Sequence, residues 1–163
     1  MEGIEVNTVT FQMIIEAARN LKNVVKETDF CYSETLSDLT GGEVYLKLEN
    51  LQQSGSFKIR GAYNKMIHLS EEEKTCGVVA SSAGNHAQGV AISATKLGIK
   101  STIVMPKSAP FAKIFATRKY GGDVVLEGEI YDDAYQKALE IKEETGATFV
   151  HPFNDPYVIA GQG

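Results

Sequence analysis

The chain has 163 residues and a formal net charge of −5 at pH 7, with 43% hydrophobic and 23% charged residues. This balance excludes a disordered or collagen-like chain and allows an α/β unit with a sizeable core. The acidic charge argues against a nucleic-acid partner, and no apolar run is long enough to predict a membrane span. The N-terminus lacks the basic and apolar parts of a secretory signal, so we expect a cytoplasmic protein.

The N-terminal part of the chain predicts three helices and one strand. From Thr10 to Val25 apolar residues recur at helical spacing, with Thr10 available as N-cap. Alternating residues over 43–49 are typical of a half-buried strand, and a helix is expected over about 56–68. Residues 70–73 have the spacing of a capping box, which predicts the start of another short helix.

From residue 78 onward, short apolar strands alternate with amphipathic helices. This alternation predicts a parallel sheet with right-handed crossovers and helices on both faces. Ligands of such sheets bind beyond the carboxyl ends of the strands, which points to the loop after the first strand. The strands are expected at 78–80, 102–105, 124–126 and 149–150, and the helices at 85–97, 110–120 and 130–145.

The loop SSAGNHAQG, residues 81–89, is the first candidate binding site. Small residues at a strand-to-helix turn leave backbone N–H groups free to hold a carboxylate or phosphate. An ordinary capped turn has a similar composition, so the loop alone is a weak signal. It lacks the pattern of a P-loop and that of a dinucleotide fingerprint. The candidate lining residues are Ser82, Ala83, Gly84, Asn85 and His86.

Lys58 is the second candidate, because it stands at the start of a predicted helix, where a positive charge is disfavoured. A lysine on an amphipathic helix is usually solvated, but Phe57 and Ile59 flank this one and Arg60 is close by. The helix start, the nearby cation and partial burial would all lower the lysine pKa and favour Schiff-base chemistry. Two distant cysteines and three histidines without a ligand motif predict no disulfide and no metal site.

Four stretches together resemble the serine/threonine dehydratases, which are fold-type II PLP enzymes. SGSFKIRGA (54–62) is similar to their pyridoxal-phosphate lysine motif, and SSAGNHAQGVA (81–91) to their asparagine loop. VMPKSAPFAK (104–113) resembles their next loop, and HPFNDPYVIAGQG (151–163) the segment that leaves their small domain. The likeness spans nearly the whole chain and is strongest toward catabolic threonine dehydratases, or threonine ammonia-lyases.

The resemblance implies a tryptophan synthase β-like fold with a parallel sheet and flanking helices. Residues 1–65 would begin the large PLP-binding domain, 66–150 would form the small α/β domain, and 151–163 would return to the large domain. The loop that holds the cofactor phosphate lies in the family's later half. We therefore expect the C-terminal half of the large domain to be absent, and the chain by itself to be inactive or nearly so.

The resemblance also implies roles for the candidate residues. Lys58 would carry pyridoxal 5'-phosphate and then remove the substrate α-proton, and Phe57 would help to bed the ring. Asn85 would hydrogen-bond the phenolic oxygen of the cofactor, and residues 82–86 would bind the substrate carboxylate. The implied reaction is elimination of L-threonine, and of L-serine, to 2-oxobutanoate or pyruvate and ammonia.

Other functions stay open. Serine racemases resemble this region but carry Ser where this chain has Ala83, and a methyl group cannot exchange protons, so elimination is favoured. Racemase or β-replacement chemistry is the enzymatic alternative. A truncated, non-catalytic chain that keeps an effector-binding or assembly surface is the alternative outside the enzymes.

Some members of the family are activated by a nucleotide, which makes AMP or CDP a candidate effector. The matching positions could equally be ordinary surface polar residues. A homo-oligomer, dimer or tetramer, is expected at full length, and the expected small-molecule partner is an amino-acid substrate. The candidate effector positions are Gln53, Ser54, Gln88, Tyr120 and Asn154.

Overall fold

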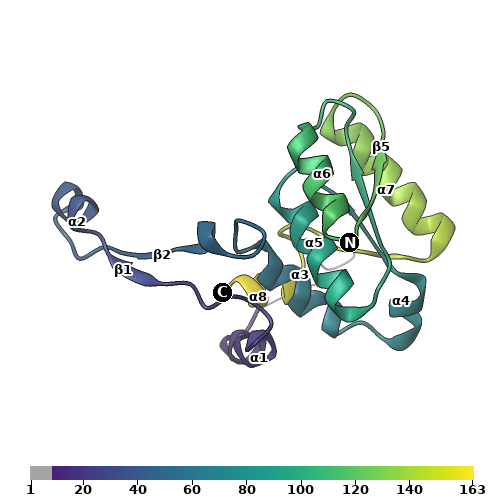
Figure 1. Cartoon of the computed structure of the whole chain (residues 1–163). Helices are drawn as coiled ribbons and strands as arrows, with labels where there is room; N and C mark the ends of the chain where they lie inside the picture. Colours follow the sequence, from purple (N-terminus) through teal and green to yellow (C-terminus); the bar gives the residue numbers. More distant parts are fainter. Residues whose placement is uncertain (1–8) are drawn as a thin grey trace, which may run out of the picture.

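The structure is a computed structural model that describes residues 9–163. A four-stranded parallel sheet forms the core of its larger part (Figure 1). The strands lie in the order β5-β4-β3-β6, and each pairing between neighbours is parallel. The predicted parallel sheet is therefore confirmed. Its strands are β3 (Val78–Ser81), β4 (Ser101–Met105), β5 (Asp123–Leu126) and β6 (Thr148–Phe149).

The connecting helices cover the sheet on both faces. They are α5 (Asn85–Leu97), α6 (Phe111–Lys119) and α7 (Tyr131–Thr145), each within one residue of the predicted bounds. Because successive strand side chains point to opposite faces, the sheet builds two separate cores. One contains Val78, Ala80, Ile103 and Met105 with Val90 and Ala94 of α5 and Ile114 of α6, and the other contains Val79 and Val104 with Ala134 and Ala138 of α7.

Side-chain caps satisfy free backbone N–H groups at the start of several of the remaining helices, but the N-cap residue of the helix that begins with Lys58 forms no such cap. In α1 (Phe11–Leu21) the Thr10 side chain accepts from Met13 N, as predicted, although the helix ends before Val25. The predicted capping box is present at α4 (Glu71–Cys76), between Ser70 and Glu73. Two further helices are α3 (Lys58–Ile67) and α8 (Pro156–Gln162).

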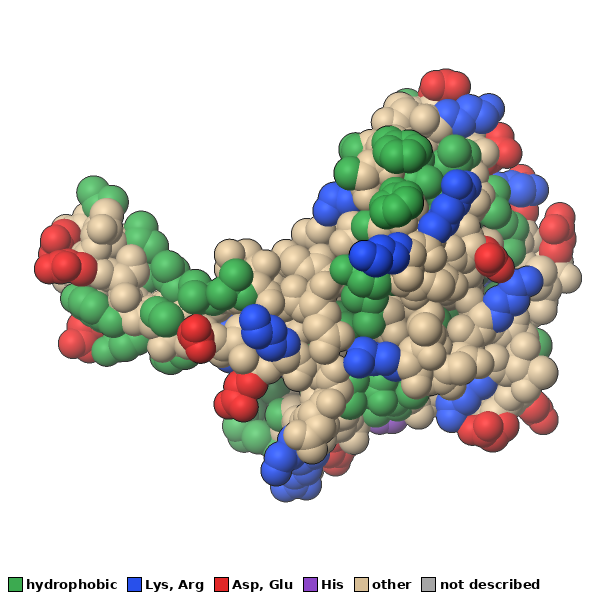
Figure 2. All heavy atoms as spheres, in the orientation of Figure 1, with side chains coloured by type: hydrophobic (Ala, Val, Ile, Leu, Met, Phe, Trp, Pro, Cys, Tyr) green, Lys and Arg blue, Asp and Glu red, His purple; other side chains and the backbone are tan. Residues whose placement is uncertain are grey.

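An arm, residues 30–47, projects from the rest of the described chain (Figure 1). It consists of β1 (Phe30–Tyr32), α2 (Glu34–Thr40) and β2 (Tyr45–Lys47), followed by the short helix η1 (Glu49–Leu51). The prediction of a half-buried strand over 43–49 is wrong in length and burial, because β2 pairs only with β1 and its three residues are exposed. In the described chain nothing covers this hairpin, and Figure 2 shows hydrophobic side chains along the arm.

Helix α3 is held between α5 and α8 at very short distances. Glycines make this approach possible, because a side chain would collide with the neighbouring helix. A Cβ on Gly89 of α5 would meet the backbone of Lys58 and Ile59 at 3.0 Å. A Cβ on Gly161 of α8 would lie 2.7 Å from the carbonyl oxygen of Arg60.

No helix in the described part of the chain is both long and apolar enough to cross a membrane.

We expect Gly161→Ala to lower the free energy of unfolding by about 1–3 kcal/mol, because the added methyl group forces α8 away from α3. Gly42→Ala is the matched control, since no atom lies within 4 Å of a Cβ at that position. The control should change stability by less than about 0.5 kcal/mol. Urea unfolding followed by circular dichroism measures both variants, and equal midpoints would contradict the proposed steric role of Gly161.

Candidate active site

A pocket of about 420 Å³ opens beyond the carboxyl end of β3. Four separate stretches of the chain meet there: the start of α3, the loop from β3 into α5, the first residue of α7 and the segment after β6. This is the edge of the sheet at which parallel α/β folds bind ligands. The lining residues are Ser56, Phe57, Lys58, Ser81, Ser82, Asn85, His86, Tyr131, Pro152 and Phe153.

Lys58 places its amine inside this pocket. Its Nζ donates to the carbonyl oxygen of Pro152 at 2.7 Å and lies 3.4 Å from Gln162 Oε1. The ammonium also stands over the Phe57 ring, 5.2 Å from the ring centroid. Burial lowers the Lys58 pKa, because the charged form loses solvation. The structure thus holds an amine that gives up its proton more readily than an exposed lysine.

The expected contribution of Arg60 to this pKa is not found. Arg60 instead forms a two-pronged ion pair with Glu49, with Nε to Oε2 at 2.8 Å and Nη2 to Oε1 at 2.7 Å. The guanidinium hydrogen bonds hold the pKa of Glu49 below its usual range. Because the positive charge of Arg60 is compensated by Glu49, burial is left as the cause of the lowered Lys58 pKa.

The segment that carries Pro152 is shaped by a histidine. The backbone N–H groups of Phe153 and Asn154 donate to His151 Nδ1 at 3.2 and 2.8 Å, which closes a tight turn around Pro152. Burial lowers the pKa of His151, so its ring stays neutral and able to accept these bonds near pH 7. This turn presents the Pro152 carbonyl to the Lys58 amine.

The loop from β3 into α5 brings the asparagine and histidine candidates to the pocket. Ser82 Oγ accepts the N–H of Gly84 at 3.2 Å, which bends the chain into α5 at Asn85. Asn85 Oδ1 accepts from Lys113 Nζ at 2.8 Å. Ala83 is partly buried and packs against the hydrophobic core.

His86 is only 4% exposed and lies at the floor of the site. Its Nε2 is 2.8 Å from the carbonyl oxygen of Val150, which can only accept, so Nε2 carries the proton and donates. Burial lowers the pKa of His86 to about 4, and the ring is therefore neutral at pH 7. In the described chain, its Nδ1 and the hydroxyl of Ser81 are buried without a hydrogen-bond partner. A bound polar ligand would satisfy such groups.

These residues fit the aldehyde and ring of a pyridoxal cofactor. The site offers an amine of lowered pKa, an aromatic side chain beside it and an amide across the pocket. Backbone N–H groups at the start of α5 and the Ser81 hydroxyl can donate to a negatively charged ligand, whereas His86 Nδ1 can only accept because the proton is on Nε2.

Sequence reasoning missed part of the lining. Ser56 and Pro152 lie inside the quoted motifs of residues 54–62 and 151–163, which gave a signal without naming them. Tyr131 had no such signal, because a tyrosine at a helix start is unremarkable until the fold brings it to β3.

Among residues 9–163 no group of three His, Cys, Asp or Glu side chains could hold a metal ion.

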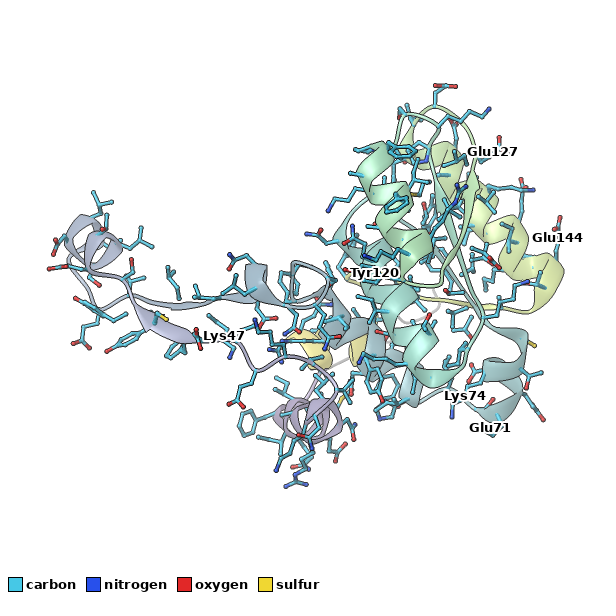
Figure 3. All side chains as sticks on the ribbon, in the orientation of Figure 1. Lys47, Glu71, Lys74, Tyr120, Glu127 and Glu144 are labelled. Atoms are coloured by element: carbon cyan, nitrogen blue, oxygen red, sulfur yellow. The ribbon has the colours of Figure 1, made fainter. Side chains whose placement is uncertain are left out.

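The candidate effector positions lie in different settings. Tyr120, which is labelled in Figure 3, follows the last residue of α6. Its hydroxyl donates to the carbonyl oxygen of Gln53 at 3.2 Å. Ser54 and Gln88 are buried, at 4% and 6% exposure, so they are not surface residues here. Asn154 donates its backbone N–H to His151, and in the described chain no hydrogen bond joins its side chain to the pair formed by Tyr120 and Gln53.

Residues 21–163 match the family model of pyridoxal-phosphate dependent enzymes. The chain belongs to this family. The resemblance that the motifs indicated is therefore confirmed. The expected cofactor, pyridoxal 5'-phosphate, is confirmed as the cofactor of this family.

Two curated relatives show how similar the chain is to individual members of the family. It is 65% identical over 155 residues to the L-threonine ammonia-lyase of Thermotoga maritima, an alignment that covers 95% of the chain and 39% of that protein. It is 49% identical over 166 residues to the L-threonine dehydratase catabolic TdcB of Staphylococcus aureus, covering 96% of the chain and 48% of the relative. The chain thus spans less than half the length of these relatives.

Solved structures agree with the predicted fold class. Threonine deaminase isoform 2 of Solanum lycopersicum superposes with a TM-score of 0.85 at 45% identity, covering 93% of this chain and 44% of that one. Maize serine racemase superposes with a TM-score of 0.88 at 35% identity, covering 94% of this chain and 46% of that one. The family member therefore has the α/β architecture of fold-type II PLP enzymes.

We expect the stability of the chain to fall in acid because of His86. Its pKa is about 4 when folded and 6.5 in the reference state, so between these values the unfolded chain binds more protons and stability falls as the pH falls. From pH 7.5 to pH 5 the loss from this residue is about 2 kcal/mol. Urea unfolding at the two pH values measures it.

His86→Gln is the comparison for this experiment. Glutamine keeps a donor for the Val150 carbonyl but does not titrate, so the pH dependence should shrink by about 2 kcal/mol. His151 changes stability in the same direction, since its pKa is also lowered, and it is present in both proteins. An unchanged pH dependence in His86→Gln would show that His86 is not held neutral.

Proposed function

We propose that this family member takes part in PLP-dependent elimination of L-threonine, and of L-serine, to 2-oxobutanoate or pyruvate and ammonia. The observation that carries the proposal is the Lys58 amine of lowered pKa in one pocket with Asn85 and the start of α5. Two relatives named L-threonine ammonia-lyase, at 65% and 51% identity, support threonine as the substrate.

The proposed roles are those that the family resemblance implies, and the positions of the chain's own groups support them. When bound, PLP supplies the electron sink that stabilises negative charge at the substrate α-carbon. The neutral Lys58 amine removes the proton from that carbon, and its lowered pKa increases the neutral fraction. Phe57 lies beside the amine to flank the cofactor ring, and Asn85 offers its amide to the phenolic oxygen.

We assign the substrate carboxylate to the loop of residues 82–86. The backbone N–H groups there are at a helix N-terminus, where the helix dipole favours a negative charge. His86 in this loop is buried and neutral. Its ring therefore carries no positive charge that would draw the carboxylate away from the backbone N–H groups. The hydroxyl of Ser82 is engaged with the Gly84 N–H and keeps the loop in shape.

Racemisation is the second candidate, favoured by the similarity to maize serine racemase. Ala83 supports elimination instead. A racemase needs a second acid or base on the opposite face of the substrate, and the Ala83 methyl group, packed against the core, has no proton to exchange. We therefore rank elimination first.

We also propose a cytoplasmic protein that forms a homo-oligomer and responds to AMP or CDP. The contact between Tyr120 and Gln53 supports the effector proposal, because it links the end of α6 to the segment that precedes Lys58. A nucleotide bound there would act on both segments at once. The 163-residue chain alone is expected to show little turnover.

We expect PLP followed by borohydride to attach the cofactor to Lys58. Peptide mapping by mass spectrometry locates the label, and Lys58→Ala should abolish it, whereas Lys100→Ala, at an exposed lysine, should not. When the chain is joined to the C-terminal part of the Thermotoga maritima relative, Lys58→Ala should reduce threonine turnover at least about a thousand-fold. Label spread over exposed lysines and absent from Lys58 in the joined protein would refute the proposal.

We expect AMP or CDP to raise the activity of the joined protein at low threonine concentration, by lowering the concentration needed for half-maximal rate. Tyr120→Phe removes the hydroxyl that donates to Gln53 and should weaken this response. The measurement is a nucleotide titration of ammonia release at fixed threonine. No change with either nucleotide would remove the effector proposal and leave the elimination proposal intact.

A further inference from the structure

The motif of residues 104–113 ends in a lysine that reaches the pocket wall. Lys113 lies in the first turn of α6, and its Nζ donates to Asn85 Oδ1 at 2.8 Å. The two residues are 28 positions apart, so only the packing of α6 beside α5 brings them together. Lys113 does not line the pocket itself, but its partner Asn85 does.

The backbone of Lys113 is fixed on both sides. Its N–H donates to the Pro110 carbonyl at 2.9 Å, and its own carbonyl accepts from the buried Thr117 hydroxyl at 2.8 Å. The next residue, Ile114, belongs to the hydrophobic core. These contacts hold the first turn of α6 in place, and the Lys113 side chain extends from it to Asn85.

The chemistry of the two groups determines which end of the amide faces which way. An ammonium group donates hydrogen bonds and accepts none, so the amide atom facing Lys113 is Oδ1. The Nδ2 group is then the end that remains for the pocket. In the described chain Nδ2 donates to no protein acceptor, and it is not among the buried unpartnered atoms, so it is open to a ligand.

We propose that Lys113 is a positioning residue that fixes the Asn85 amide so that the pocket is offered a donor and not an acceptor. A donor suits an anionic phenolic oxygen, whereas a rotated amide would present its own oxygen and repel it. The inference deepens the proposed function and rests on it, since it assigns to Lys113 the orientation of the group that meets the cofactor oxygen.

The test compares three variants of the chain. Lys113→Met keeps the length of the side chain and removes the donor, Lys113→Arg keeps a cationic donor, and Lys119→Met removes the same charge from an exposed position of α6. The first readout is the NMR signal of the Asn85 side-chain amide without cofactor, assigned by its loss in Asn85→Asp. The second is the PLP concentration needed for half-maximal borohydride labelling of Lys58, measured with each variant joined to the C-terminal part of the Thermotoga maritima relative.

Lys113→Met should shift the Asn85 amide signals and raise the half-maximal PLP concentration about ten-fold, the effect of losing one hydrogen bond to a charged oxygen. Lys113→Arg should restore most of both, and Lys119→Met should match the parent chain. Unmoved Asn85 signals in Lys113→Met, or a labelling defect that Lys113→Arg does not restore, would overturn the inference. If the parent protein, joined to the C-terminal part of the Thermotoga maritima relative, takes no label at Lys58, the proposed function fails and the amide signals alone decide the role of Lys113.

Discussion

The close packing of α3 against α5 and α8 is the constraint on which the site depends. Gly89 and Gly161 let two helices approach the first turns of α3 at distances that no other residue permits. Lys58 is the first residue of α3, so these contacts set its position together with the hydrogen bond from its N–H to Ser56 Oγ at 3.3 Å. A helix held in this way keeps the amine in a fixed direction, which a reactive group requires.

Burial controls the charge of the pocket. It lowers the pKa of Lys58, His86 and His151, and in each case it is the largest cause. The two histidines are neutral near pH 7, and Arg60 is paired with Glu49 outside the lining. The site therefore keeps one amine able to exchange a proton, surrounded by groups that hydrogen-bond without carrying charge.

The site is assembled from segments that the sheet brings together. The carboxyl end of β3 supplies the loop into α5, and the segment after β6 supplies the carbonyl that holds Lys58. Because β3 and β6 are parallel neighbours, their ends meet at one edge. Helix α6 adds one more contact to this arrangement, because Lys113 donates to Asn85 at the end of the same loop.

The sequence alone determined the alternation of strands and helices, the caps at Thr10 and Ser70, and the two motifs with Lys58 and Asn85, because these depend on short-range periodicity and spacing. It could not determine the partners of these residues. Lys58 meets Pro152 across 94 positions, and Arg60 turns to Glu49 although it stands two residues from the lysine. Only the tertiary structure decided these contacts and the exposure of the arm, because burial and long-range pairing are properties of packed elements and not of local pattern.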